Sequence, residues 1–185
     1  IVPSLHQITR VAAGGSQAMA LRANGTVVVW GDNWADQLNI PADLDQVVDI
    51  AASGSGCLAL KADGTVVAWG SFFDDNKGKL TPNAPPGLSN VVAIAARGEV
   101  FLALRADGTV VAWGDSASVL LRVPMDLHGV NSIAVGDAHV LACVGPTPLA
   151  ILQRPQDQTV CLGEPVLLTV RAIARSGTSL THRWQ

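Results

Sequence analysis

The chain has 185 residues, of which 49% are hydrophobic and 15% charged, and this composition excludes an intrinsically disordered chain. Twelve basic residues against 15 acidic ones give a net charge of −3, so the sequence lacks the basic footprint of a nucleic-acid-binding protein. No apolar run approaches the roughly 18 residues that a membrane-spanning helix needs.

Four similar segments, each following a proline, predict the first strand of a repeated unit. They cover residues 5–13, 44–52, 88–96 and 127–135. Their starts recur with a period of about 40 residues, as in repeat architectures, and the step from the second segment to the third is the longest. Residues 47–52, VVDIAA, are short and partly β-branched, as strands are.

A second motif keeps the same spacing and predicts a β-hairpin in each unit. It reads NGTVVVWG at 24–31 and DGTVVAWG at 63–70 and 107–114. Asn-Gly or Asp-Gly between two apolar runs is a strong hairpin signal, because a tight turn needs positive φ angles, which Asn, Asp and Gly tolerate. We therefore assign Gly25, Gly64 and Gly108 to the turns. The extra length of the longest step falls in the loop after Gly70.

An antiparallel unit of about 40 residues that repeats predicts the blade of a β-propeller. A single blade buries only part of its apolar surface, so neighbouring blades stack face to face. The tryptophans that recur at one position, Trp30, Trp69 and Trp113, are expected to pack between blades. Cys57 and Cys143 are expected to be small core residues within strands.

Residues 3–145 resemble the repeats of the regulator of chromosome condensation family, in which an I-A-A-G segment precedes a D-G-x-V-x-x-W-G strand. The resemblance implies three blades and part of a fourth, out of a usual seven. The short period is similar to that of the compact bacterial branch, which includes a secreted β-lactamase inhibitory protein. The histidine of the family motif is replaced by Gln17, Gly56 and Val100 and is kept only as His139, so it is not a shared essential site.

A second module is predicted after the propeller repeats, which we assign to residues 1–145. Residues 146–153 begin with a Pro-Thr-Pro stretch and are predicted to be a linker. Residues 154–185 resemble the first part of an immunoglobulin-like sandwich, with Trp184 on the strand that carries the core tryptophan. We thus expect an all-β chain, a partial propeller plus an incomplete sandwich, cut from a longer protein at both ends.

Motifs for catalysis, metal or cofactor binding are not assigned. Residues 53–56, SGSG, lack a nucleophile elbow and a phosphate-binding lysine, so we interpret them as a turn between strands. Asp74 and Asp75 lack the spacing of a calcium loop. The histidines and cysteines lack the clustering that a zinc site needs.

The loops that follow each Trp-Gly step are the candidate partner-binding site. They gather on one rim if the blades align, and they combine large aromatic rings with polar and acidic residues, as interface anchors do. The candidates are Asp32, Asn33, Trp34, Asp36, Phe72, Phe73, Asp74, Asp75 and Asp115. The aromatic rings could instead fold back over the blade edge, and the sequence leaves both interpretations open.

These features predict a non-enzymatic module that binds a protein or a glycan, in a secreted or cell-surface, multidomain bacterial protein. The alternative, a guanine-nucleotide exchange factor for a small GTPase, rests on fold analogy alone. An open set of blades leaves strand edges and an apolar blade face unpaired, so the isolated chain is expected to dimerise or aggregate.

Overall fold

The computed structural model describes residues 5–74, 78–115, 118, 121–145, 150–153, 168–173 and 179–184. The chain divides into two compact units, Ile1–Val144 and Gly145–Gln185. The residues described in both units form strands, turns and loops with no α-helix, so the all-β prediction is confirmed. None of them forms a helix that could cross a bilayer.

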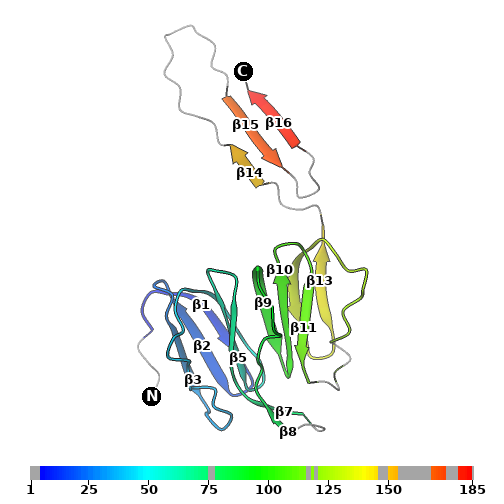
Figure 1. Ribbon diagram of the computed structural model, residues 1–185. Helices are drawn as coiled ribbons and strands as arrows, with labels where there is room; N and C mark the ends of the chain where they lie inside the picture. The colour runs from blue at the N-terminus through cyan, green and yellow to red at the C-terminus, as the bar shows by residue number, and fades with distance from the viewer. Residues whose placement is uncertain are drawn as a thin grey trace. The chain divides into compact units, whose positions relative to one another are not determined.

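The first unit is a row of antiparallel blades (Figure 1). The strands are β1 (Ile8–Ala13), β2 (Gln17–Arg22) and β3 (Val27–Gly31), then β4 (Val47–Ala52), β5 (Gly56–Lys61) and β6 (Val66–Gly70), then β9 (Val91–Arg97), β10 (Val100–Arg105) and β11 (Val110–Gly114), and last β12 (Val130–Val135) and β13 (Val140–Val144). We call these sets blades 1 to 4. In blades 1 to 3, the first strand packs against the next blade in the row.

The hairpin turns differ from the expected geometry. Each is a three-residue loop in which only the glycine has a positive φ, for example 80° at Gly25 and 83° at Gly108. The residue before the glycine has a negative φ and acts through its side chain instead. The carboxylate of Asp63 accepts hydrogen bonds from the backbone N–H and the hydroxyl of Thr65, at 2.9 and 2.6 Å.

Backbone hydrogen bonds join each hairpin turn to the following blade. The Gly25 carbonyl accepts from Val47 N–H at 3.3 Å, and the same bond joins Gly64 to Val91 and Gly108 to Val130. The residue before each first strand has a positive φ, whatever its type: Gln7, Gln46, Asn90 and Gly129. The sequence does not reveal this repeated feature, because three of the four residues are not glycine.

The hydrophobic core lies between blades. Met19 and Leu21 of blade 1 pack against Ile50, Cys57 and Trp69 of blade 2. The opposite face of blade 2 packs on blade 3 through a second cluster, which includes Leu58, Leu60, Phe101 and Trp113. Alternate residues of one strand therefore serve two different interfaces, as the pleat of a strand requires.

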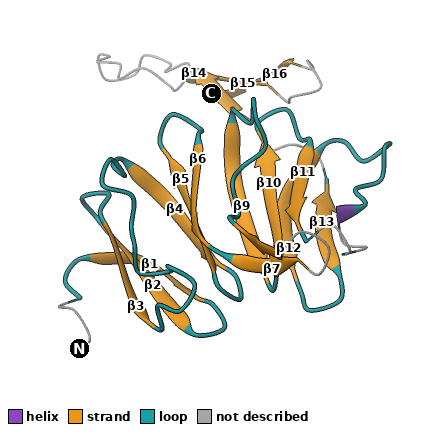
Figure 2. Cartoon of the chain, turned by 60° about the horizontal axis from the view of Figure 1, so that its bottom comes forward, coloured by secondary structure: helices purple, strands orange, loops and turns teal. Residues whose placement is uncertain are grey.

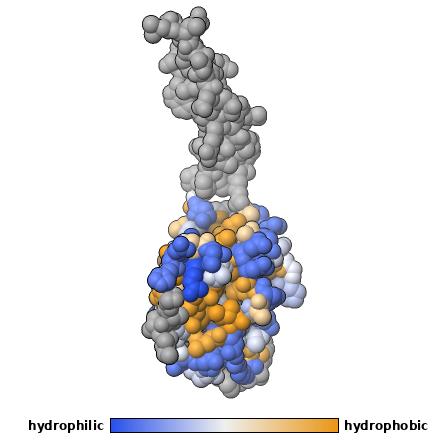
Figure 3. All heavy atoms as spheres, turned by 90° about the vertical axis from the view of Figure 1, so that its left-hand side faces the viewer, coloured by the Kyte–Doolittle hydropathy of each residue, from blue (hydrophilic) through white to orange (hydrophobic). Residues whose placement is uncertain are grey.

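Two outer faces of the row have no neighbouring blade among the described residues. Trp30, on the face of blade 1 that points away from blade 2, is only partly buried, and Val11 on the same face is 75% exposed. Figure 3 views the unit from this side and shows an apolar patch bordered by hydrophilic residues. At the other end Cys143 is exposed on β13. The prediction that Cys143 is a core residue is therefore wrong, whereas Cys57 is buried as expected.

The longer repeat contains a small hairpin, β7 (Phe72–Asp74) with β8 (Gly78–Leu80), which follows directly on β6 (Figure 2).

The second unit contains β14 (Ala150–Gln153), β15 (Leu168–Ile173) and β16 (Ser179–Trp184) in one antiparallel sheet, in that order. The linker predicted at residues 146–153 therefore contains a strand, β14. Its residues follow the Pro-Thr-Pro stretch and pair with β15.

Candidate functional site

The loops after the Trp-Gly steps share one rim of the first unit. The turns between the first two strands of successive blades are hydrogen-bonded to each other, from Gly15 N–H to the Gly54 carbonyl and from Gly54 N–H to the Gly98 carbonyl. The segments after Trp-Gly start beside these turns, since Asp32 N–H donates to the Ser16 carbonyl and Asp115 N–H to that of Glu99. The Trp-Gly strands of these blades therefore end on the same side.

Residues 32–40 form a loop with many internal hydrogen bonds. The Asn33 side chain accepts from Leu38 N–H at 2.8 Å, and the Asp36 carboxylate accepts from the Asn39 amide at 3.0 Å. Gln37 is fully buried, and its carbonyl accepts hydrogen bonds from the indole N–H of Trp69 at 2.8 Å. Asn33 and Asp36 thus hold the loop in shape, and Gln37 anchors it to blade 2.

Trp34 lies at the exposed part of this loop, with 66% of its surface accessible. Asp32 and Asn33 beside it are exposed. Asp36 is half exposed and forms an ion pair with Lys79 of β8, with 3.2 Å between the ammonium and the carboxylate. The β7–β8 hairpin therefore contributes a cation next to Asp36, and the surface is less acidic than the sequence suggested.

Phe72 does not belong to this surface. It is only 3% exposed, and its ring lies 5.9 Å from that of Phe101, in the cluster between blades 2 and 3. The assignment of Phe72 to a binding rim is wrong, because β7 continues from β6 and directs this side chain into the core. The backbone of Phe73 and Asp74 is in β7, but their side chains and the whole of Asp75 lie outside the described residues.

In the third copy Asp115 lies near Glu99. One carboxylate oxygen of Glu99 is buried and has no hydrogen-bond partner among the described residues. Burial raises the pKa of Glu99 to about 7, and the negative charge of Asp115 adds to the rise. Sequence reasoning missed Glu99, which occupies the place of Ser16 and Ser55 in the first two copies.

We expect Glu99 to make stability depend on pH. Its folded pKa lies above the ordinary value of 4.5, so the folded state holds the proton more tightly, and the free energy of unfolding falls as pH rises from about 4.5 to about 7. The rise in the pKa of Glu99 corresponds to a loss of about 3 kcal/mol in the free energy of unfolding. Solvent screening at this half-buried site reduces the expected loss to about 1 kcal/mol. Denaturant unfolding at pH 5 and pH 8 measures the loss. The Glu99→Gln variant should lack this part of the pH dependence, and an equal loss in that variant would contradict the assignment.

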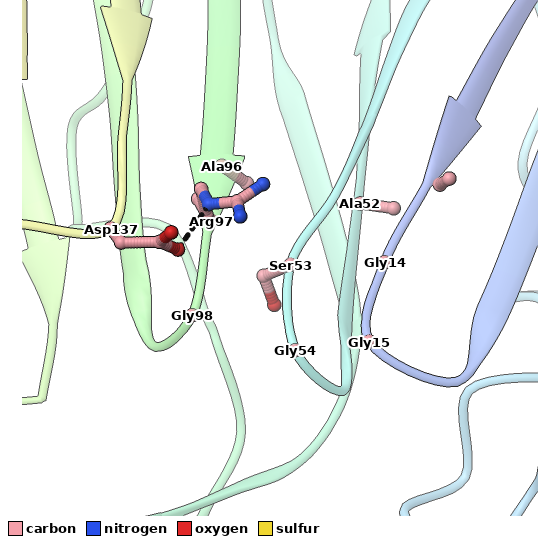
Figure 4. A pocket seen from close by; sticks show the side chains of 10 residues that line it. Gly14, Gly15, Ala52, Ser53, Gly54, Ala96, Arg97, Gly98 and Asp137 are labelled. Atoms are coloured by element: carbon pink, nitrogen blue, oxygen red, sulfur yellow. Dashed lines mark hydrogen bonds and ion pairs between the residues drawn. The ribbon is translucent and has the colours of Figure 1, made fainter.

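A pocket of about 260 Å³ lies at the ends of the first strands of the blades (Figure 4). Its wall is largely main chain from three small-residue turns, including the Ser53–Gly54 turn, and Gly15 and Gly54 already use their N–H groups between blades. Arg97 and Asp137 supply its charges and form an ion pair with each other. No group of three metal-binding side chains occurs within the described ranges. The pocket offers little chemistry, and Trp34 remains the best candidate contact residue.

Comparison with known proteins agrees with this architecture. Residues 8–33 match the family profile of the regulator of chromosome condensation (RCC1) repeat. Prp20p of Saccharomyces cerevisiae, a protein with binding properties to Gsp1p and histones, is similar in structure, with 21% identity over 90% of this chain and 44% of that chain and a TM-score of 0.60. A second structure of yeast RCC1 (Prp20), bound to Kap60, gives 18% identity over 94% of this chain and 55% of that chain, with a TM-score of 0.55.

Human WBSCR16 is also similar, with 18% identity over 94% of this chain and 46% of that chain and a TM-score of 0.51. The chain thus spans about half the length of these proteins. The search of curated proteins finds no match. The described blades have the fold of an RCC1-like β-propeller.

Proposed function

We propose that the first unit is a non-catalytic binding module that presents residues 32–40 to a protein partner, with Trp34 as the anchor. The observation that carries this proposal is the exposure of the Trp34 indole, 66%, on a loop that is hydrogen-bonded internally and to blade 2. A large exposed ring on a preorganised loop loses little conformational entropy on binding, and truncation of such anchors weakens interfaces most.

The charge around Trp34 favours a basic partner surface. Asp32 is an exposed carboxylate two residues from the indole, and the Asp36 charge is shared with Lys79. The whole chain carries a net charge of −3, which favours encounter with basic proteins at low salt. The fold supports this role, since the similar protein Prp20p binds other proteins.

We further propose that the chain belongs to a secreted or cell-surface bacterial protein, and that its second unit is the start of an immunoglobulin-like domain. The short repeat period and the antiparallel order β14-β15-β16 support this proposal. Fractionation of cells that express the full gene tests the location.

Trp34→Ala is expected to weaken partner binding by at least roughly 30-fold, because a buried aromatic anchor contributes about 2 kcal/mol or more. The probe is a set of basic peptides selected against the wild-type chain from a displayed library, with affinities measured by calorimetry. Met125→Ala is the control, since Met125 is fully exposed in another inter-blade loop. Equal affinity of wild type and Trp34→Ala for all selected peptides would overturn the proposal, as would selection of glycans alone in a parallel array.

An exchange assay distinguishes this function from the alternative. The chain is added to a small GTPase loaded with a fluorescent guanine nucleotide, and nucleotide release is followed. We expect no acceleration, whereas release that depends on the chain would assign it a catalytic function.

A further inference from the structure

Blades 2 and 3 carry a basic residue at the same place. Residues 41–46 and 85–90 lead into these blades and make the same backbone hydrogen bonds, one inside a turn that begins at a proline and one from the residue after the middle strand. Lys61 is the last residue of β5, and Arg105 is the last residue of β10. The surroundings of the two cations can therefore be compared residue by residue.

In blade 2 the chain itself neutralises this cation. The Lys61 ammonium forms an ion pair with the Asp45 carboxylate at 2.7 Å. The hydrogen bond to Asp45 raises the pKa of Lys61, and the negative charges of Asp45, Asp63 and Asp43 add to the rise. Lys61 thus has one carboxylate partner and two further carboxylates nearby.

In blade 3 the cation is kept, but two of these three carboxylates are replaced. Ser89 takes the place of Asp45, and Gly87 takes the place of Asp43. Arg105 forms no ion pair with the residues that the structure describes. Its Nε–H is buried and has no hydrogen-bond partner among them. Buried polar groups are almost always paired, so the chain leaves this guanidinium with hydrogen-bonding capacity that it does not use.

A cleft of about 480 Å³ lies at this place in blade 3. It is lined by Gly87, Ser89, Asn90, Arg105, Ala106 and Asp107. Two of these residues, Gly87 and Ser89, are the ones that replace the carboxylates of blade 2. The third carboxylate is conserved between the two blades as Asp107, which already accepts hydrogen bonds from the backbone N–H and the hydroxyl of Thr109, at 2.9 and 2.7 Å. The cleft therefore offers a cation whose carboxylate partner the chain does not supply.

We propose that this cleft binds a carboxylate group of a peptide, with the Arg105 guanidinium as the cation and the Ser89 hydroxyl as a second donor. The planar guanidinium matches the geometry of a carboxylate. A singly charged group fits better than a phosphate, because Arg105 is the one cation among the lining residues and Asp107 adds a negative charge to the same cleft.

The cleft is distant from the surface around Trp34. It lies beside the hairpin turn between β10 and β11, whereas the segment after Gly114 starts at the opposite end of the same strands. The proposal therefore does not rest on the proposed function.

A titration followed by nuclear magnetic resonance tests the proposal. The reporter is the Arg105 Nε–H signal of the isotope-labelled chain, which is assigned by its loss in Arg105→Gln. The probes are the tripeptide Gly-Glu-Gly, acetylated and amidated at its ends, and the matched tripeptide Gly-Gln-Gly. We expect a saturable shift with the glutamate peptide and binding at least about tenfold weaker with the glutamine peptide, because hydrogen bonds to charged groups are the stronger ones.

Two further probes identify the source of the oxyanion. Acetylated Gly-Gly-Gly with a free carboxyl end tests a chain terminus as the ligand, and binding of this peptide or of the glutamate peptide supports the proposal. Inorganic phosphate is the fourth probe, and phosphate that binds more tightly than both carboxylate peptides would overturn the assignment to a carboxylate.

A matched pair of variants keeps the test independent of changes at Arg105. Ser89→Asp restores the carboxylate that blade 2 has at this place, so it should pair with Arg105 and weaken binding of the glutamate peptide at least about tenfold. Ser89→Asn has the same size and keeps a donor but carries no charge, so it should retain most of the affinity. Residue 89 is exposed, and both variants are expected to fold.

Three results would contradict the carboxylate site. The first is a glutamate peptide that produces no saturable shift of the Arg105 signal. The second is equal affinity of the glutamate and glutamine peptides. The third is a folded Ser89→Asp chain that binds the glutamate peptide as tightly as wild type does.

Discussion

Trp69→Ala is expected to lower the free energy of unfolding by about 3–5 kcal/mol, because removal of a large buried ring leaves a cavity between blades. Trp69 is 6% exposed, packs against Met19 and Leu21 across the interface, and donates its indole hydrogen bond to the Gln37 carbonyl. The variant therefore loses packing and also leaves the buried Gln37 carbonyl with only the weak Cys57 thiol donor, at 3.8 Å. Urea unfolding, followed by circular dichroism, measures the difference from wild type.

The other tryptophans provide matched controls for this result. Trp30 occupies the same repeat position on the outer face of blade 1 and is only partly buried, so Trp30→Ala should cost clearly less than Trp69→Ala. Trp34→Ala should cost least, because the indole is largely exposed. If Trp34→Ala destabilised the fold as much as Trp69→Ala, Trp34 would be a packing residue and the binding proposal would fail.

Gly114→Ala is the second change with a large expected effect, a loss of about 2–5 kcal/mol or of folding altogether, because strain and overpacking add at this position. Gly114 has a φ of 135°, which L side chains rarely adopt, and a Cβ built there would lie 1.9 Å from the Glu99 carbonyl oxygen. Conformational strain of about 1–2 kcal/mol therefore adds to an overpacking cost of about 1–3 kcal/mol. The equivalent glycines Gly31 and Gly70 also have positive φ and close carbonyl oxygens.

The control for Gly114→Ala is Gly87→Ala. Gly87 has a φ of 78°, and a Cβ there would have no atom within 4 Å, so only the conformational cost of about 1–2 kcal/mol applies. Thermal unfolding of both variants measures the difference. Equal stability of the two would show that the close approach to the Glu99 carbonyl does not constrain this position.

The sequence predicted the blades well because two motifs repeat with the same spacing. Consecutive apolar residues such as Leu58 and Ala59 lie on opposite faces of a strand, so an apolar run predicts a strand that is buried on both faces. The Asp-Gly steps predict the turns. The positive φ before each first strand could not be predicted, because it depends on hydrogen bonds from the neighbouring hairpin and not on residue type. The Ala23 and Ala62 N–H groups, for example, donate to the Gln7 and Gln46 carbonyls.

The candidate site was predicted only in part. Trp34 was identified because an aromatic residue in a polar loop is unusual, and the same criterion selected Phe72, which is buried. The difference arises from β7, whose pairing with β8 sets the direction of the Phe72 side chain, and no repeat of this hairpin exists among the described residues to reveal its register. The Asp36–Lys79 ion pair joins residues 43 positions apart and has no signal in the local sequence.

The bond between each hairpin turn and the next blade has a consequence for synthesis on the ribosome. The Gly25 carbonyl receives its donor from Val47, at the start of the next blade, and the Gly64 carbonyl receives its donor from Val91 in the same way. A blade that has just emerged therefore lacks a neighbour only until a short further stretch of chain appears. Because all these partners are near in sequence, blades are expected to fold in order as they emerge, and the last one to form remains the least protected from misassembly.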